Sequence, residues 1–92
     1  MIKSFAHKGL EEFFLTGRVK GIQAKHAVKL EWILDLLDVA TRPEQMRFAG
    51  SGLHKLKGDL SNHWSVKVSG NWRLTFFFDG EDAYLVNYQD YH

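Results

Sequence analysis

The stretch from His63 to Tyr91 constrains the fold more than any other, because its apolar residues alternate over three successive runs. Breaks at Ser69-Gly70-Asn71 and Asp79-Gly80-Glu81-Asp82 separate these runs. Glycine-containing breaks between alternating runs are typical of β-hairpins. The pattern therefore predicts an antiparallel β-meander at the C-terminal end of the chain.

The alternation also predicts a pairing register, because a slip of one residue would move every side chain to the opposite face. A three-residue turn at 69–71 keeps the faces separate, whereas a two-residue turn Gly70-Asn71 would set Val68 beside Arg73. The predicted pairs are Trp64–Phe76, Val66–Leu74 and Val68–Trp72 across the first turn, and Phe78–Tyr84, Phe76–Val86 and Leu74–Tyr88 across the second. One face then holds the predicted core: Trp64, Val66, Val68, Trp72, Leu74, Phe76, Phe78, Tyr84, Val86 and Tyr88.

The opposite face of the meander carries mainly polar side chains, as expected for an antiparallel sheet with one face in water. They are His63, Ser65, Lys67, Arg73, Thr75, Asn87, Gln89 and Tyr91, with Phe77 and Leu85 as an apolar island. Lys67 and Arg73 are predicted cross-strand neighbours, and like charges so placed destabilise a sheet by up to about 1 kcal/mol. Either the two cations splay apart into solvent or an anion binds between them.

Upstream of the meander the apolar spacing indicates helices. Leu10, Phe13 and Phe14 lie on one face of a helix that begins near Lys8 and ends at Gly17. The other predicted elements are a strand at 2–5, a helix at 23–40, an irregular loop at 44–53 and a strand at 54–57. This order predicts one α+β domain over 1–92, with two N-terminal helices packed on a curved antiparallel sheet.

The composition excludes several classes of protein. Twelve Lys and Arg against eleven Asp and Glu give a net charge of +1, so any polyanion would bind at a focused site. The chain has no cysteine, which excludes disulfides and cysteine-based metal sites and fits a reducing cytoplasm. Neither a membrane span nor a signal peptide is predicted. The five histidines lack metal-ligand spacing, so no metal or other cofactor is expected.

A specific combination of residues is spread over four segments. These are Met1-Ile2-Lys3-Ser4-Phe5, Leu56-Lys57-Gly58-Asp59, Asn71-Trp72-Arg73-Leu74-Thr75-Phe76 and Ala83-Tyr84-Leu85-Val86-Asn87-Tyr88-Gln89-Asp90-Tyr91-His92. Together they resemble the HigB toxins of the RelE-like superfamily, also called plasmid maintenance killer proteins. The similarity runs over nearly the whole chain, and its helical part and the loop at 44–53 are the least distinctive.

The resemblance implies the RelE-like microbial RNase toxin fold and the toxin role in a type II toxin–antitoxin system. Members of that family are ribosome-dependent endoribonucleases that cleave messenger RNA during translation, without a metal, by attack of the 2′-hydroxyl on the adjacent phosphate. The implied partners are mRNA, the decoding site of the ribosome and a HigA-like helix-turn-helix antitoxin, through which alone the toxin reaches operator DNA. The implied catalytic residues are His54, Lys57, Arg73, Tyr91 and His92.

These residue types suit the chemistry. The guanidinium of Arg73 can hold two phosphate oxygens, and the ammonium of Lys57 adds a second positive charge. His92 is expected to be the general base or acid and His54 its counterpart, because the imidazole pKa is near neutrality. Tyr91 can stack on an extruded nucleotide. Lys55, His63 and Lys67 are expected to support RNA binding.

Two alternatives follow from the same residues. An unbroken strand at 54–57 would point His54 toward the core, so that His54 would be a buried structural residue unless the strand is bulged or lies at the sheet edge. For the whole chain, the alternative is a non-catalytic module of the same fold that binds RNA or an antitoxin-like protein. Trp32, Phe48 and the Phe77/Leu85 island would then form the protein contact.

Overall fold

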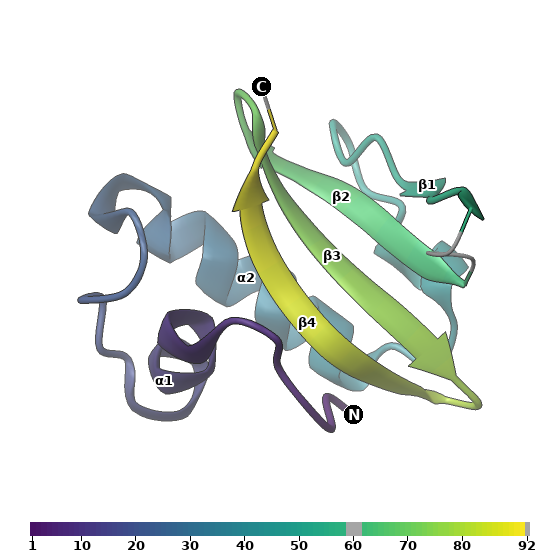
Figure 1. The fold of residues 1–92 in the computed structure, drawn as a ribbon, viewed down its shortest axis with the longest axis horizontal. Coiled ribbons are helices and arrows are strands. Elements are labelled where there is room, and N and C mark those ends of the chain that lie inside the picture. Colours follow the sequence, from purple (N-terminus) through teal and green to yellow (C-terminus); the bar gives the residue numbers. More distant parts are fainter. Residues whose placement is uncertain (59–61, 92) are drawn as a thin grey trace.

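The computed structural model describes residues 1–58 and 62–91 and has an α+β architecture (Figure 1). The helices are α1 (Lys8–Thr16) and α2 (Ala27–Val39), with short 3-10 helices η1 (Ala24–His26) and η2 (Pro43–Met46). The strands are β1 (His54–Lys55), β2 (His63–Ser69), β3 (Trp72–Asp79) and β4 (Asp82–Asp90). They form one antiparallel sheet in the order β1-β2-β3-β4. The long helix α2 lies behind this curved sheet, so one sheet face stays open to the viewer.

The β2–β3 hairpin confirms most of the predicted register and corrects its turn. Val66 pairs with Leu74 and Trp64 with Phe76, as predicted, but Ser69 rather than Val68 stands opposite Trp72. The turn has two residues, and Gly70 has φ 55°, the positive value that a type II′ turn needs at its first central position. The register shifts between Lys67 and Ser69, so a bulge at Val68 absorbs the extra residue and both faces stay sorted.

The β3–β4 hairpin contains a second bulge that the alternation did not predict. Leu74 pairs with Tyr88 as predicted, but Phe77 rather than Phe78 is the partner of Tyr84, and Phe78 pairs with Ala83. The shift falls between the pairs of Thr75 and Phe77, where Leu85 adopts φ 55°. As a result Tyr84 leaves the predicted core, and Ala83 takes its place there, fully buried.

The buried core fills the space between α2, α1 and the helix-facing side of the sheet. The apolar stripe of α2 supplies Leu30, Ile33, Leu34 and Leu37, all fully buried. Leu10 and Phe13 reach this core from α1, whose first turn is capped by His7 Nδ1 accepting the Leu10 N–H at 2.9 Å. Gly17 ends α1 in the left-handed region, at φ 81°, as its sequence position predicted. From the sheet, the fully buried apolar residues are Val66, Val68, Leu74, Phe76, Ala83 and Val86.

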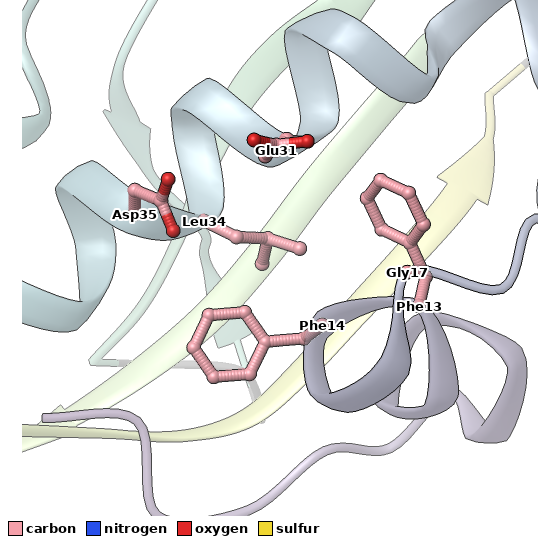
Figure 2. Close-up of a pocket in the computed structure, with 6 residues that line it drawn as sticks. All are labelled: Phe13, Phe14, Gly17, Glu31, Leu34 and Asp35. Carbon is pink, nitrogen blue, oxygen red and sulfur yellow. The ribbon is translucent and has the colours of Figure 1, made fainter.

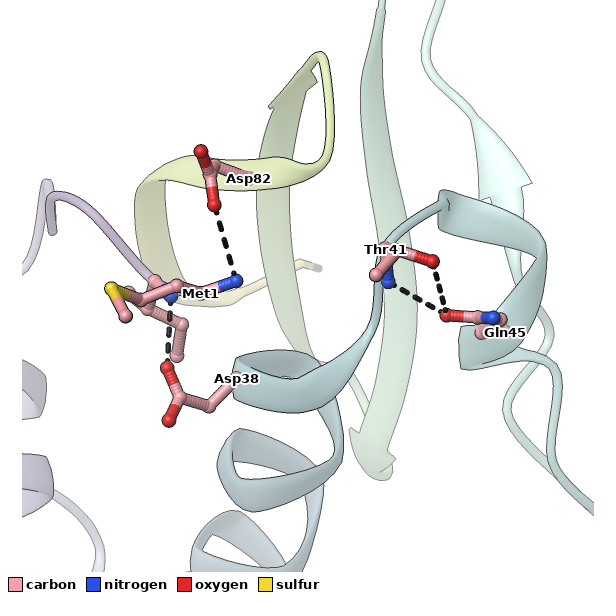
Figure 3. Close-up of polar contacts among 6 residues, drawn as sticks. Met1, Asp38, Thr41, Gln45 and Asp82 are labelled. Atoms are coloured by element: carbon pink, nitrogen blue, oxygen red, sulfur yellow. Dashed lines mark hydrogen bonds and ion pairs between the residues drawn. The ribbon is translucent and has the colours of Figure 1, made fainter.

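The N-terminal segment lies parallel to β4 but forms isolated bridges rather than the predicted strand at 2–5. Ile2 bridges to Ala83 and Phe5 to Val86. Ser4 sits opposite the β4 bulge, where its Oγ accepts the Leu85 N–H at 2.9 Å. Two carboxylates hold the start of the segment (Figure 3): Asp82 pairs with the Met1 amino group at 3.3 Å, and Asp38 accepts the Ile2 N–H at 2.9 Å.

The loop predicted at 44–53 is more ordered than its sequence indicated. It begins with η2, which buries Met46 completely, and Gln45 Oε1 accepts the Thr41 N–H at 2.7 Å (Figure 3). Ser51 is also buried, and its carbonyl accepts the Lys67 N–H at 2.7 Å. These contacts fix the approach of the chain to β1, which ends at Lys55 instead of the predicted Lys57. No helix in the described ranges is both long and apolar enough to cross a membrane.

Candidate functional site

The sheet face that α2 leaves uncovered carries ordered rows of polar side chains, which we call the polar face. Residues that pair across strands share a face, so the register defines the rows. The first row is Lys67, Arg73 and Gln89, and the second is His54, Ser65, Thr75 and Asn87. The polar face was predicted from the alternation, and the register confirms that Lys67 and Arg73 stand directly opposite each other.

A hollow of about 220 Å³ lies on this polar face. It is lined by Ala6, Leu56, His63, Thr75, Leu85, Asn87, Gln89 and Tyr91. The concavity is thus formed by the N-terminal segment, the residue after β1, the three long strands and the residue after β4. Ala6 and Leu56 had no signal in the sequence, because their arrival depends on how the N-terminal segment and β1 run along the two sheet edges.

Arg73 is held in a defined orientation at the hairpin end of the polar face. Its Nη1 donates to the carbonyl of Gly70 at 2.7 Å and to that of Trp72 at 3.1 Å. Lys67, its exposed neighbour across the strands, keeps its charge in solvent. Two cations side by side at the tip of a hairpin form a local positive centre in a chain of nearly zero net charge.

Tyr91 is tied to the same hairpin through its backbone. Its N–H donates to the carbonyl of Asn71 at 2.8 Å, and its side chain, 37% exposed, lines the hollow. The end of β4 accordingly lies beside the β2–β3 turn in Figure 1. His92, the predicted acid or base, follows Tyr91 in the sequence and lies outside the described residues.

His54 lies on the polar face, so the buried alternative for this residue is wrong. It pairs with Ser65 at the sheet edge and is exposed, with its Nδ1 3.0 Å from the carbonyl of Gly52. A donor role for Nδ1 in this contact would leave Nε2 as the acceptor nitrogen. Since β1 is the outermost strand, His54 stands at the rim of the second row, in line with Thr75.

The two lysines that flank Leu56 are placed differently. Lys55 pairs with Trp64 and its Nζ lies 6.0 Å from the centre of that ring, so it is on the core side of the sheet rather than the polar face. Lys57 is exposed and follows Leu56, whose N–H donates to the His63 carbonyl at 2.8 Å. Lys57 is therefore level with Asn62, about 17 Å along the direction of β2 from the Arg73 row, five residues at a strand's rise. The Arg73 guanidinium turns toward Gly70, at the end of the hairpin that is farther from Lys57.

His63 is a half-buried member of the hollow. Its ring lies 5.2 Å from that of Phe77, and its Nδ1 is buried without a hydrogen-bond partner among the described residues. The Oγ of fully buried Ser65 is likewise unpartnered within the described ranges. Buried polar atoms are rarely left without a hydrogen-bond partner, and each unmade hydrogen bond costs about 1–3 kcal/mol. Both atoms belong to residues of the polar face.

Behind the polar face, a cluster formed by buried His26 and Tyr88 and half-buried Trp72 supports the strands that carry Arg73 and Gln89. Trp72 stacks on Tyr88 with ring centres 4.4 Å apart, and the Tyr88 hydroxyl is hydrogen-bonded to Nδ1 of His26. Burial, and then the nearby charges of Lys25 and Lys29, lower the pKa of His26 below its usual value. Burial likewise raises the pKa of the Tyr88 hydroxyl. The pair is therefore neutral near pH 7 and acts as a structural contact.

A second concavity lies between α1 and α2 (Figure 2). Phe13, Phe14 and Leu34 provide apolar groups, and Glu31 and Asp35 add carboxylates along α2. The adjacent outer surface of α2 exposes Val28 (85%), Trp32 (51%) and Val39 (73%). Their spacing places them on one helix face, which the described part of the chain leaves uncovered.

Within residues 1–58 and 62–91, no three His, Cys, Asp or Glu side chains are grouped so that they could hold a metal ion. The charged groups of the polar face are instead cations, and an anion is the ligand that they suit. The hollow beside them adds amide, imidazole and aromatic groups. This combination is typical of sites for single-stranded nucleic acid, where cations follow the backbone and aromatic rings stack on bases.

The chain is similar to known proteins over almost its whole length. Residues 3–92 match the model of the family described as the RelE-like toxin of the type II toxin–antitoxin system HigB. The chain is also 44% identical over 92 residues to a protein of Proteus vulgaris named Endoribonuclease HigB, and the match covers 100% of both. The resemblance seen in the sequence and the α+β fold expected from it are thus confirmed. The chain belongs to the HigB family, the RelE-like toxins of type II toxin–antitoxin systems.

Proposed function

We propose that this chain is a ribosome-dependent endoribonuclease that cleaves messenger RNA during translation and thereby arrests growth. The observation that carries the proposal is the meeting of Arg73 and Tyr91 at one end of the polar face, through the hairpin that contains Gly70 and Asn71. The name of the Proteus vulgaris relative, Endoribonuclease HigB, supports the same reaction.

In the proposed reaction the ribose 2′-oxygen forms a bond to phosphorus while the bond from phosphorus to the 5′-oxygen breaks. His92 takes the 2′-hydroxyl proton and His54 gives a proton to the leaving 5′-oxygen, or the two exchange roles. Arg73 binds two phosphate oxygens with its fork, and Lys57 adds positive charge as the phosphate becomes more negative. Tyr91 stacks on a nucleotide of the RNA. The products are a 2′,3′-cyclic phosphate and a 5′-hydroxyl, without a cofactor.

The low net charge is the reason to invoke the ribosome. With a net charge of +1, the chain has too little basic surface to hold RNA by counterion release alone. A partner that presents the message in a fixed conformation would supply the positioning that the chain lacks. The decoding site of the ribosome does so for each codon, and we accordingly place the activity in the cytoplasm.

The test is to induce the chain in cells and map message ends by sequencing, with products typed for 2′,3′-cyclic phosphate. We expect cuts within translated regions, and Arg73→Gln should abolish them while the protein stays folded. Arg18→Gln is the matched control, because exposed Arg18 pairs with Glu12 on α1, away from the polar face. Cuts that persist in Arg73→Gln, or products with a 5′-phosphate, would rule out this mechanism.

The exposed stripe on α2 favours a second function, binding of the antitoxin that the family implies. Trp32 is the centre of the stripe, with Val28 and Val39 on either side. The Trp32 ring packs edge-on against the Phe48 ring, with ring centres 4.9 Å apart. The carboxylates of Glu31 and Asp35 flank the stripe on the α1 side. A helix with an apolar stripe and basic flanks would complement this surface. We assign it to a HigA-like helix-turn-helix antitoxin, which alone would carry the complex to operator DNA.

Co-expression separates this surface from catalysis. Trp32→Asp should keep the chain toxic but prevent a HigA-like antitoxin from relieving the arrest, because the buried centre of the contact would carry a charge. Leu15→Asp is the control, since Leu15 is 69% exposed on α1 and outside the stripe. Full rescue of the Trp32→Asp strain by the antitoxin would exclude the stripe as the docking surface.

A further inference from the structure

The hollow on the polar face differs chemically from its cationic end. Ala6, Leu56 and Leu85 contribute apolar groups to it, while Asn87 and Gln89 contribute side-chain amides. Arg73 and Lys67 are not among its lining residues. A site of this composition suits a planar group with both donors and acceptors at its edge, rather than a phosphate.

The polar groups of the hollow have hydrogen-bonding capacity that the fold does not use. Gln89 Nε2 donates to Thr75 Oγ1 only at 3.4 Å, a long contact, and its Oε1 accepts no bond within the described residues. Asn87 Oδ1 accepts the Tyr88 N–H at 2.9 Å, which leaves the Asn87 amide nitrogen free to donate within the described part. His63 Nδ1 is buried and without a partner there, as stated above.

The hollow is also adjacent to the position expected for the scissile phosphate. Gln89 stands directly opposite Arg73 across β3 and β4, and Asn87 is one row further along the same face. A nucleotide whose phosphate lies on the Arg73 guanidinium can therefore direct its own or its neighbour's base over Gln89. Tyr91, which lines the hollow, offers that base an aromatic surface.

We infer that the hollow is a base-reading subsite, in which Asn87 and Gln89 hydrogen-bond the edge of a nucleobase flanking the cleaved phosphodiester. This inference rests on the proposed function and extends it, because it assigns sequence preference to residues separate from the catalytic set. Unstacked bases of single-stranded RNA are recognised in this way, by aromatic stacking and by hydrogen bonds to their edges. Amide side chains can offer a donor and an acceptor to one base at once.

The decisive variant is Gln89→Glu, which keeps the shape of the side chain but replaces its donor by a second acceptor and adds a negative charge opposite Arg73. We expect it to change the base preference at one position next to the cut by roughly tenfold or more, while preferences elsewhere stay the same. Gln45→Glu makes the same exchange far from the hollow, where Oε1 continues to accept the Thr41 N–H, and should leave the preference unchanged.

Cleavage mapping of the wild type and both variants gives distinguishable results. If the wild type cuts and Gln89→Glu cuts with an unaltered preference, the subsite is wrong and the proposed function stands. If the wild type does not cut, the proposed function is wrong, and binding alone then tests the hollow.

Binding is measured by nuclear magnetic resonance of the Asn87 and Gln89 side-chain amides during titration with the four nucleoside 5′-monophosphates. Saturable shifts with at least one nucleotide, absent with ribose 5-phosphate, would support a base site. Equal shifts with ribose 5-phosphate, or none with any nucleotide, would overturn it.

Discussion

Arg73 lies directly opposite Lys67 across β2 and β3, although both carry a positive charge. The guanidinium turns back onto the hairpin, where Nη1 donates to the carbonyls of Gly70 and Trp72 at 2.7 and 3.1 Å. These bonds fix one cation while the exposed lysine beside it remains in solvent. The arrangement is unfavourable for the isolated chain and favourable once an anion occupies the site. If the proposed RNA site is here, RNA binding should therefore stabilise the sheet.

Lys67→Gln should therefore have opposite effects on stability and on binding. Removing the like-charge neighbour of Arg73 should raise the free energy of unfolding by a few tenths of a kcal/mol to about 1 kcal/mol. The same change should lower the salt dependence of single-stranded RNA binding, with a log–log slope smaller by about 0.7. Urea denaturation and fluorescence titration at several salt concentrations measure the two effects.

Lys55→Gln is the matched control for that pair of measurements, because Lys55 lies over Trp64 on the other side of the sheet. Its salt slope should equal that of the wild type. A Lys67→Gln protein with an unchanged slope would mean that Lys67 makes no contact with the RNA.

Tyr91 should contribute to cleavage through its ring, since its backbone N–H already makes the contact with Asn71. Loss of a base–aromatic stack costs about 1–3 kcal/mol, so Tyr91→Ala should raise KM roughly 5- to 150-fold. Tyr91→Phe keeps the ring and should behave like the wild type if stacking is its role. A large loss of kcat in Tyr91→Phe would instead assign a function to the hydroxyl.

Alternation in the sequence was enough to predict the two sheet faces and the opposition of Lys67 and Arg73. It did not predict the bulges at Val68 and near Leu85, because alternation shows which residues share a face but not where an extra residue is inserted. At the β4 bulge the Leu85 N–H donates to a distant partner, the Ser4 hydroxyl. Such a partner cannot be inferred from the residues around 85 themselves.

The candidate site was predictable to a similar extent. Arg73 and Tyr91 came from segments whose spacing and resemblance both indicated them, and the structure brings them to one hairpin. Lys55 was expected to support RNA binding but lies on the core side, and His54 was left ambiguous, because β1 is two residues long and its alternation carries little information. The hollow needed the structure, since Ala6 and Leu56 reach it from opposite edges of the sheet.

Gly9 and Gly21 should be required for the packing of α1 against the turn before η1. A Cβ at Gly9 would lie 2.7 Å from the Gly21 Cα, and one at Gly21 would lie 2.5 Å from the Gly9 Cα. Alanine within a helix normally gains up to about 1 kcal/mol over glycine. Overpacking against backbone costs typically 1–3 kcal/mol, so this steric cost should exceed the gain in helix propensity.

We therefore expect Gly9→Ala to lower the free energy of unfolding by about 1 kcal/mol or more in chemical denaturation. Glu11→Ala, at an exposed position of the same helix, should change it little. A higher denaturation midpoint for Gly9→Ala would show that the two backbone segments can separate at negligible cost.

The buried contact of His26 with Tyr88 should make the fold less stable in mild acid. Burial, followed by the charges of Lys25 and Lys29, lowers the His26 pKa in the folded chain, whereas the unfolded chain keeps a value near 6.5. Below pH 6.5 the unfolded chain thus binds more protons than the folded one, and the free energy of unfolding falls as the pH falls. The contribution is fully present above pH 6.5 and is lost as the pH drops through the folded pKa.

Urea denaturation between pH 7.5 and 5.5 measures this loss, and His26→Gln should flatten the slope whatever its effect on overall stability. His54→Gln is the control, because it removes an exposed histidine that is not part of the buried contact. Identical slopes for the wild type and His26→Gln would assign the acid sensitivity to other groups. A difference in slope would mean that acid weakens a contact next to the polar face. Trp72 and Tyr88, the ring partners of His26, are the sequence neighbours of Arg73 and Gln89.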